Sequence, residues 1–582
     1  MHGFFNRLLR IDLSRESFRY EAIPDEDLSR TLGGKGLGIA LLWKENPPGV
    51  DPLSPENRFI FTTGPATGTR LWSQSRFGAF TKSPATGGFG ESYCGGSLAP
   101  QLKGCGIDAV ILEGKSPSLT FLAVDESGVT FHDAAPLKGK DTAQTEDFIL
   151  GHSMPGARAM TIGPAGENLV RFACIKSEKW RSLGRCGLGA VLGSKNVKGL
   201  SFRGSQKAKI ADDDLLRECG QRIARKGKES PVSALYRKYG TPMQVANTNA
   251  QNCFPTRYWQ SGHFPKWENL SADYLIEHFE VVNHPCPNCF LQCTKHSKVK
   301  RGRHQGLELD GPEYETIYAL GGLNELDSLE EVAYLNVLCD QLGLDTMSAG
   351  NMAGFAVEAF KRGKIDFAID YNEPDRMAEL FRRIAAIEGE GALLALGIKQ
   401  ASKKLGLESI AIHVKGLEPA GFEPRVLKGM ALSYATSARG ACHLRGTFYK
   451  AELSGLVDRD MIRGKARHHI DYEDRAVLFD CLILCRFFRD IILWEDLGDI
   501  IKATTGVSYG RSELEFLANS ITQQTRAFNL REGMTSADDG LPERFLREKT
   551  TEGASLSGAD LDIMIEEYNA IREGRMLNPP QG

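Results

Sequence analysis

The stretch HPCPNCFLQC constrains this chain most, because it places Cys286, Cys289 and Cys293 within eight residues. Thiolates at this spacing can converge on one face of a cubane, which is how short cysteine runs hold iron–sulfur clusters. Such a cluster needs a fourth ligand, and the best candidate is Cys485 in the segment DCLILCRF. We therefore predict a [4Fe–4S] cluster that joins the middle of the chain to its C-terminal third.

Other interpretations of these cysteines are weaker. A zinc site more often shows paired CxxC arms or neighbouring histidine pairs, and His284 and His296 form no such arm. A radical-SAM site has its three-residue gap before its two-residue gap, which is the reverse of the order here. A chance group of buried cysteines is the remaining alternative.

Length and charge disfavour several classes of protein. A chain of 582 residues is long enough for three or four packed units. The formal net charge of −3 indicates no nucleic-acid partner, and no apolar run approaches the roughly 20 residues of a membrane helix. The first residues lack the apolar stretch and cleavage site of a signal peptide. With 13 cysteines and no export signal, reduced thiols in an anaerobic cytoplasm fit better than disulfides.

Residues 1–208 are predicted to be rich in strands, because short β-branched and aromatic segments alternate there with Gly, Pro and Asn. No tandem repeat is visible. The predicted strand segments are LLRIDLS (8–14), SFRYEAI (17–23), RFIFTTG (58–64), AVILEG (109–114) and LTFLAV (119–124).

Glycine is concentrated in this same region, in clusters that match neither a dinucleotide fingerprint nor a P-loop. They predict either tight turns or close backbone approach to a large phosphorylated ligand, and the two interpretations have similar support. In the second case, Arg76, Arg181 and Arg185 would supply positive charge. The clusters lie at 33–38, 64–69, 87–96 and 184–196.

From about residue 210 the apolar periodicity becomes helical. Ser328 and Glu331 form a capping box at the start of one helix, and Gly343 suits its end. The acidic stretch 534–558 indicates a loop, and KVKRGRH (298–304) an exposed hairpin tip. The predicted helices are 212–228, 328–343, 348–362, 374–388, 391–405, 473–487, 511–528 and 559–572.

Two six-residue segments are similar, DQLGLD (340–345) and DCLILC (480–485). Alone, each indicates only a solvated aspartate and a core leucine. However, six motifs follow one another as GPATGT, CxxCxxxC, GPEYET, DxxGLD, GMALSYATSARGACHLR and DxxxxC. In this order the chain resembles the aldehyde ferredoxin oxidoreductase family, from residue 3 to roughly residue 530.

The resemblance implies an α+β fold with three domains. A β-rich domain (1–208) would bind pterin phosphates, and two mostly helical domains (209–417 and 418–582) would enclose the cofactor at the junction. That cofactor is tungsten held by the dithiolenes of two pterins, with Mg²⁺ bridging the pterin phosphates and a [4Fe–4S] cluster nearby. The implied cluster ligands are Cys286, Cys289, Cys293 and Cys485.

The resemblance also implies which residues contact the pterins. Carboxylates such as Asp340 and Asp480 suit the amino-pyrimidine edge of a pterin, which offers paired N–H donors. The chain departs from the family at Tyr93, where members often carry Asn, and at Ile483, where they often carry Gly; a tyrosine supplies no amide carbonyl to Mg²⁺. The implied cofactor-binding residues are Arg76, Tyr93, Gly95, Arg181, Arg185, Asp340, Leu344, Asp345, Arg445, Asp480 and Leu484.

For the chemistry, the resemblance selects Glu315 and His443. Without it, Glu315 would be a carboxylate at a helix N-terminus and His443 a hydrogen-bonded core histidine. Within the family pattern, His443 donates a hydrogen bond to an aldehyde carbonyl, and Glu315 acts as general base on water. The cofactor takes the two electrons, and the cluster passes them on singly.

The implied function is reversible, tungsten-dependent oxidation of aldehydes to carboxylic acids in the cytoplasm. Ferredoxin or a ferredoxin-like subunit would accept the electrons, with room for a further flavin-containing, NAD-reducing subunit. The nearest alternative is a benzoyl-CoA reductase-type catalytic subunit with the same cofactor. A non-catalytic iron–sulfur electron-transfer subunit is the second alternative, and it leaves Glu315 and His443 without a role.

Overall fold

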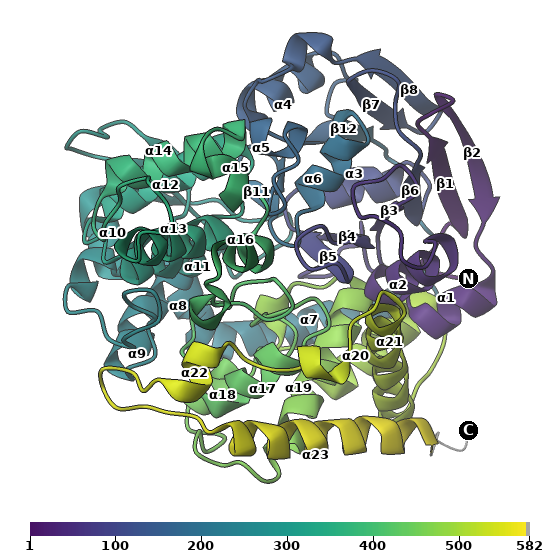
Figure 1. Cartoon of the computed structure of the whole chain (residues 1–582). Coiled ribbons are helices and arrows are strands. Elements are labelled where there is room, and N and C mark those ends of the chain that lie inside the picture. The colour runs from purple at the N-terminus through teal and green to yellow at the C-terminus, as the bar shows by residue number, and fades with distance from the viewer. Residues whose placement is uncertain (578–582) are drawn as a thin grey trace.

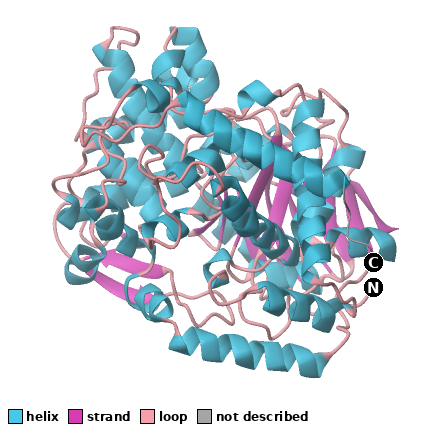
Figure 2. Ribbon diagram, turned by 90° about the horizontal axis from the view of Figure 1, so that it is seen from below, coloured by secondary structure: helices cyan, strands magenta, loops and turns pink. Residues whose placement is uncertain are grey.

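A computed structural model of the chain describes residues 1–577. Strands dominate the N-terminal part and helices the remainder, so the predicted α+β class is confirmed (Figure 1). Figure 2 shows most strands gathered together, while a small three-stranded sheet lies apart from them. The end of the predicted third domain, residues 578–582, lies outside the described residues. None of the helices among residues 1–577 combines the length and apolar character needed to cross a bilayer.

The N-terminal domain consists of two six-stranded sheets with the same topology. The first has the order β2-β1-β6-β3-β4-β5, and the second has the order β8-β7-β12-β9-β10-β11, in which every strand number is six higher. In both, an antiparallel hairpin is followed by a parallel pairing with the last strand of the unit. The domain is therefore a structural duplication, although the sequence shows no tandem repeat.

Both sheets contribute to one hydrophobic core, which includes Phe61 and Val110 from the first and Met160 and Leu200 from the second. The first sheet contains β1 (Arg7–Asp12), β2 (Ser17–Ala22), β3 (Phe59–Thr62), β4 (Phe77–Lys82), β5 (Phe89–Cys94) and β6 (Ala109–Glu113). The second contains β7 (Thr120–Asp125), β8 (Gly128–Asp133), β9 (Arg158–Thr161), β10 (Ile175–Ser177), β11 (Arg181–Leu183) and β12 (Val197–Arg203). The helices of this domain are α1 (Asp25–Thr31), α2 (Gly34–Glu45), α3 (Leu98–Gly104), α4 (Thr142–Gly151), α5 (Pro164–Glu167) and α6 (Leu188–Ser194).

The middle of the chain is helical apart from one small sheet. That sheet contains β13 (Phe279–Asn283), β14 (Lys295–Val299) and β15 (Glu308–Asp310), and the loop from β14 to β15 includes the predicted hairpin tip. The helices are α7 (Asp213–Glu229), α8 (Pro231–Tyr239), α9 (Gln244–Ala250), α10 (Ala272–His278), α11 (Tyr314–Thr316), α12 (Leu329–Leu342), α13 (Thr346–Lys361), α14 (Pro374–Ala386), α15 (Glu390–Leu394) and α16 (Ile398–Leu405).

The last part of the chain packs below the other two in the view of Figure 1. Its helices are α17 (Lys428–Thr436), α18 (Tyr449–Leu453), α19 (Lys465–Leu482), α20 (Trp494–Thr505), α21 (Arg511–Arg531), α22 (Glu543–Arg547) and α23 (Gly558–Leu577). Helices α2 and α19 contact each other, so this part reaches the N-terminal domain directly.

Three local predictions were wrong. The predicted helix 391–405 is divided into α15 and α16, because Gly397 has a φ of +78° that ends regular helix. The predicted helix 473–487 starts earlier and ends at Leu482, since Ile483 adopts the left-handed conformation. The stretch 534–558, predicted as a loop, contains α22.

Candidate active site and cluster cavity

All four predicted cluster cysteines line one cavity of about 280 Å³. Cys286, Cys289 and Cys293 lie in the loop between β13 and β14, and Cys485 lies just beyond the end of α19. The thiol of Cys286 accepts a hydrogen bond from the backbone N–H of Gly96 at 3.3 Å. The fold thus brings two distant segments together as an iron–sulfur cluster would require, while the ligand roles themselves stay a prediction.

The N-terminal domain contributes positive charge and a close backbone approach to this cavity. Arg76 lies 3.9 Å from the thiol of Cys485, and Arg181 donates a 2.6 Å hydrogen bond to the hydroxyl of Thr294. A Cβ atom on Gly95 would lie 3.1 Å from the thiol of Cys286. The predicted phosphate-binding residues Arg76, Gly95 and Arg181 therefore line the same cavity as the four cysteines.

Tyr93 also lines this cavity, but its polar groups are already engaged. Its phenol donates a 2.6 Å hydrogen bond to Glu91, and its backbone carbonyl accepts one from Arg76 at 2.9 Å. The guanidinium of Arg445 lies 5.2 Å from the centre of the tyrosine ring. Tyr93 is therefore a positioning residue for Glu91 and Arg445.

The two similar aspartate segments occupy equivalent places against the duplicated domain. A Cβ atom on Gly64 would collide with the carbonyl oxygen of Leu482, and one on Gly163 would collide with the carbonyl oxygen of Leu342. Each glycine begins a Gly-Pro-Ala sequence, one in each copy of the six-stranded unit. Glycine is required at both positions because a side chain there would collide with the backbone at the end of a helix.

The first aspartate segment spans the end of α12, where Asp340 forms an ion pair of 2.6 Å with Lys176. Burial outweighs Lys176 and raises the pKa of Asp340 above its ordinary value. Asp345 caps α13 by accepting the N–H of Met347 at 3.0 Å. Leu344 between them is buried.

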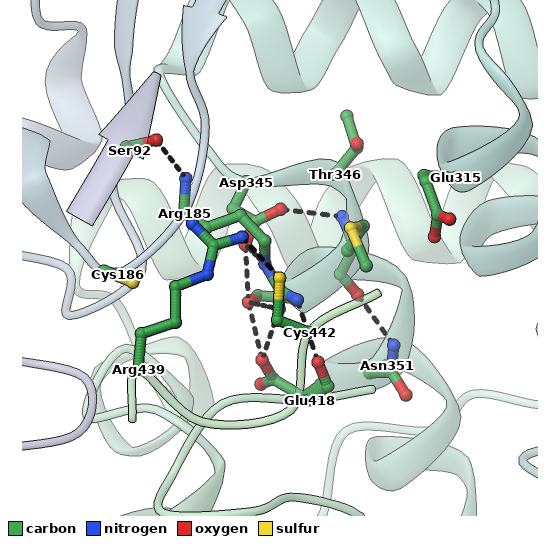
Figure 3. Close-up of polar contacts among 12 residues, drawn as sticks. Ser92, Arg185, Cys186, Glu315, Asp345, Thr346, Asn351, Glu418, Arg439 and Cys442 are labelled. Carbon is green, nitrogen blue, oxygen red and sulfur yellow. Dashed lines mark hydrogen bonds and ion pairs between the residues drawn. The ribbon is translucent and has the colours of Figure 1, made fainter. Parts of the chain in front are cut away.

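Figure 3 shows how Arg185 joins this segment to the last part of the chain. Its Nε lies 2.9 Å from Asp345, and its Nη2 lies 3.3 Å from Glu418. Ser348 donates a 2.7 Å hydrogen bond to Glu418, so the two buried carboxylates share two donors. The predicted pterin contact Asp345 is thus held in a fixed orientation.

The second aspartate segment ends α19, where Asp480 accepts from two arginines. Arg445 Nη1 lies 2.6 Å from one carboxylate oxygen, and Arg486 Nε lies 3.0 Å from the other. Arg445 also contacts Glu91 at 2.8 Å. Burial opposes the charged form of Glu91, yet Arg445 and Lys35 hold its pKa well below the ordinary value. Asp480 and Glu91 are therefore ionised and fix Arg445 between them.

The end of α19 also explains the departure at Ile483. This residue adopts a φ of +57°, a conformation for which glycine is suited and which a β-branched side chain rarely takes. The side chains of Ile483 and Leu484 are both buried. Burial of a large aliphatic side chain, about 1.5–3 kcal/mol, offsets a left-handed penalty of about 1–2 kcal/mol.

Glu315 and His443, selected for chemistry, face each other. Glu315 Oε1 lies 3.5 Å from His443 Nε2, and its other oxygen accepts the N–H of Gly421 at 3.0 Å. Glu315 lies on α11, directly before a π-helical turn (Ile317–Gly321), and such turns are frequent at functional sites.

Burial controls the protonation of this pair. It raises the pKa of Glu315 to about 8, whereas burial together with Arg439 and Arg185 lowers the pKa of His443 well below its ordinary value. At neutral pH the pair is therefore mainly a protonated carboxyl group and a neutral imidazole. The rings of Phe422 and Tyr449 stack at 4.0 Å, and Phe422 lies 5.9 Å from His443, so one wall of the site is aromatic.

Several charged residues around Glu315, His443 and the aspartate segments were not predicted from the sequence. Lys35 lies in a glycine cluster that was noted, and Arg439 and Cys442 lie in the motif that contains His443, but neither pattern indicates a role. Arg439 donates a 2.8 Å hydrogen bond to the thiol of Cys442, and this guanidinium overcomes burial to lower the thiol pKa to about 7. The missed residues are Lys35, Glu91, Lys176, Glu418, Arg439, Cys442 and Arg486.

Arginines from the N-terminal domain and from the last part of the chain are buried or half-buried between these parts. Within residues 1–577, Nε of Arg439 and Nε of Arg445 are buried without a hydrogen-bond partner. A buried polar atom of this kind is costly unless a further group satisfies it. The arginines are Arg76, Arg181, Arg185, Arg439, Arg445, Arg486 and Arg489.

Known proteins similar to this chain identify its class. A family model described as "Aldehyde ferredoxin oxidoreductase, N-terminal domain" matches residues 8–204, and one described as "Aldehyde ferredoxin oxidoreductase, domains 2 & 3" matches residues 218–573. The chain is therefore an oxidoreductase. It is 34% identical over 590 residues to the tungsten-containing aldehyde ferredoxin oxidoreductase of Pyrococcus furiosus, covering 98% of this chain and 96% of the relative. The chain belongs to the aldehyde ferredoxin oxidoreductase family.

Two further similarities define the breadth of this relationship. The WOR-like subunit of an aliphatic sulfonate oxidoreductase from Pyrococcus furiosus is 30% identical over 486 residues, which cover 76% of this chain and 75% of that protein. The active-site complex of a benzoyl coenzyme A reductase, solved with 1,5-dienoyl-CoA, contains a chain with a TM-score of 0.85 and 21% identity. That match covers 98% of this chain and 94% of the other, so the fold is shared.

Proposed function

We propose that this enzyme oxidises aldehydes reversibly to carboxylic acids in the cytoplasm, with a tungsten bis-pterin cofactor. Electrons would leave through a [4Fe–4S] cluster to ferredoxin or a ferredoxin-like subunit. The observation that carries this proposal is the 3.5 Å pairing of Glu315 with His443, close to a group of buried arginines between the N-terminal domain and the last part of the chain. A further flavin-containing, NAD-reducing subunit stays a prediction from the family resemblance.

The residues present fit this cofactor set. Buried arginines suit the phosphates of two pterins, and the unpartnered Nε atoms of Arg439 and Arg445 offer donors that nothing else uses within the described residues. The four cysteines around one cavity supply the thiolates of a cluster. Mg²⁺ would complete the set by neutralising phosphate charge, and Tyr93 has no side-chain amide oxygen to offer it, since its phenol donates to Glu91.

The protein's own groups would manage protons and orientation. When bound, the tungsten cofactor supplies the two-electron oxidation. The imidazole of His443 is neutral, so its N–H donates to the aldehyde carbonyl oxygen and stabilises the negative charge that develops there. Ionised Glu315 accepts a proton from the water that adds to the carbonyl carbon. The overall change converts an aldehyde and water into a carboxylic acid, two protons and two electrons.

A mainly apolar surface cavity shares helix α18 with this site, and we propose it as the approach for apolar aldehydes. Its volume is about 700 Å³, and its lining includes Leu235, Met243 and Leu453. Helix α18 forms part of the wall, and the same helix contains Tyr449, whose ring lies 6.1 Å from that of His443.

The same lining disfavours the benzoyl-CoA reductase alternative. Among the described residues that line this cavity, the basic side chain is Lys450, which is paired with Asp490 at 2.5 Å. A coenzyme A thioester would require free basic groups for its phosphates.

Elemental analysis of anaerobically purified enzyme tests the cofactor set. We expect about one tungsten and about four irons per chain, together with aldehyde-dependent reduction of a dye. The proposal fails if protein purified from cells supplied with tungsten and molybdenum contains iron but neither of these metals. The alternative function, an iron–sulfur electron-transfer subunit, would then be favoured.

The activity should also depend on pH through Glu315. The base must be ionised, and burial raises its pKa to about 8, so kcat/KM should rise about tenfold per pH unit below 8 and level off above it. The measurement is dye reduction at subsaturating aldehyde from pH 6 to 9.5. A profile that stays flat across this range would exclude Glu315 as the base.

A further inference from the structure

A cluster of two histidines and one aspartate lies beside the cysteine cavity and has no role in the proposed reaction. His296 on β14 and Asp310 on β15 are directly opposite each other in the antiparallel pair. His284 follows β13, and its backbone N–H donates to the carbonyl of Thr294 at 3.1 Å. Hydrogen-bonded strands therefore fix all three positions before any ligand binds.

The ligand atoms are spaced as a metal ion requires. Nδ1 of His284 lies 2.8 Å and 3.0 Å from the two carboxylate oxygens of Asp310, and Nδ1 of His296 lies 3.0 Å from one of them. One ligand atom from each residue lies within 4.8 Å of the others. Adjacent ligands at about 2.1 Å from a zinc-like cation are about 3.0–3.4 Å apart, so each imidazole already lies close to the required distance from the carboxylate.

Burial and the surrounding groups also suit a cation. The side chain of Asp310 is 3% exposed, whereas that of His284 is 49% exposed, so the site has a buried anion and an open approach from solvent. Glu308 lies 3.8 Å from Nε2 of His296, in the position of a carboxylate that orients a ligating imidazole. Arg181, 3.7 Å from Asp310, opposes a second positive charge and so weakens the affinity.

We propose that His284, His296 and Asp310 form a second metal site, which binds a divalent transition metal such as Zn²⁺. Two imidazoles and one carboxylate favour the zinc, iron(II) and cobalt(II) class over Mg²⁺ or Ca²⁺, which prefer oxygen ligands. Solvent supplies the remaining ligands. The alternative is that both imidazoles donate hydrogen bonds to Asp310 and hold no metal.

The test is Zn²⁺ binding by the anaerobic holoenzyme after brief chelation that leaves its iron in place. The wild-type enzyme should bind one Zn²⁺ per chain, and His296→Gln should weaken binding at least tenfold with unchanged iron content. His304→Gln is the matched control, because His304 also pairs with a carboxylate, Glu331 at 3.0 Å, but lies outside the cluster. This variant should bind Zn²⁺ like the wild type.

A second measurement identifies the ligands. Zinc X-ray absorption of the wild-type enzyme should show two imidazole nitrogens at about 2.0–2.1 Å with oxygen ligands, and Asp310→Asn should also weaken binding. Equal Zn²⁺ uptake by wild type and His296→Gln, or uptake dominated by sulfur ligands, would overturn the proposal. Because the readout is Zn²⁺ binding, a failure here is distinct from a failure of aldehyde oxidation.

Discussion

Replacing Glu315 by Gln is expected to lower kcat/KM for aldehyde oxidation by about 10²–10⁴-fold, with tungsten and iron contents unchanged. The amide keeps the size of the side chain and its contact with the N–H of Gly421, but it cannot accept a proton from water. The carboxyl group is already largely protonated at neutral pH, so the substitution adds little disturbance to the buried site. Residual activity should also lose its dependence on pH near 8.

The matched control is Glu325→Gln, which changes an exposed glutamate ten residues further along the chain. Glu325 is paired with Arg257 at the surface, 2.6 Å away, and touches none of the buried arginines. Its replacement should leave kcat/KM within about twofold of wild type, since exposed ion pairs contribute little. If Glu315→Gln retained full turnover, Glu315 would have to be removed from the mechanism and His443 considered alone.

The sequence predicts those parts of the site in which the type and spacing of the residues imply a further ligand. Three cysteines at cluster spacing require a fourth, and the structure places Cys485 with them in one cavity. The α+β class follows from the change of apolar periodicity near residue 210, and most helix positions follow from caps and apolar spacing. The selection of Glu315 and His443 came only from the family resemblance, and their 3.5 Å pairing was not predicted because no local pattern relates residues so far apart.

The parts that the sequence does not predict depend on long-range pairing. Lys176 and Glu91 look like ordinary strand residues, yet tertiary contacts place them opposite Asp340 and Arg445. The duplication of the N-terminal domain could not be predicted from the sequence either. It is defined by the order and pairing of the strands, while the side chains of the two copies differ. The glycine clusters were predicted to form tight turns or to approach a phosphorylated ligand, whereas Gly64 approaches the backbone of α19.

The duplication gives a physical reason for two similar aspartate segments. In each copy of the six-stranded unit, the third strand leads into a Gly-Pro-Ala loop that receives one helix end, so the two copies form two equivalent half-sites. Asp340 meets Lys176 in one half, and Asp480 meets Arg445 in the other. Two equivalent half-sites suit a cofactor with two equivalent pterins. The two halves differ where Cys485 takes the place of Asp345, which directs one segment to the cysteine cavity.

Replacing Cys485 by Ala is expected to remove most of the iron, from about four atoms per chain, and to abolish electron transfer to ferredoxin. Its thiol lies in the cavity with those of Cys286, Cys289 and Cys293, and a guanidinium nitrogen of Arg76 lies 3.9 Å from it. Without a fourth thiolate, a cubane has one iron open to solvent and to loss.

The control for this prediction is Cys481→Ala, four residues earlier in the chain and inside α19. Cys481 is fully buried in a hydrophobic cluster on α19 and does not line the cavity, so its loss should lower stability slightly and leave the iron in place. If Cys485→Ala kept all its iron, another thiol must complete the cluster. The nearest alternative is Cys94, which adjoins Gly95 in the cavity wall, and Cys94→Ala would then lose the iron instead.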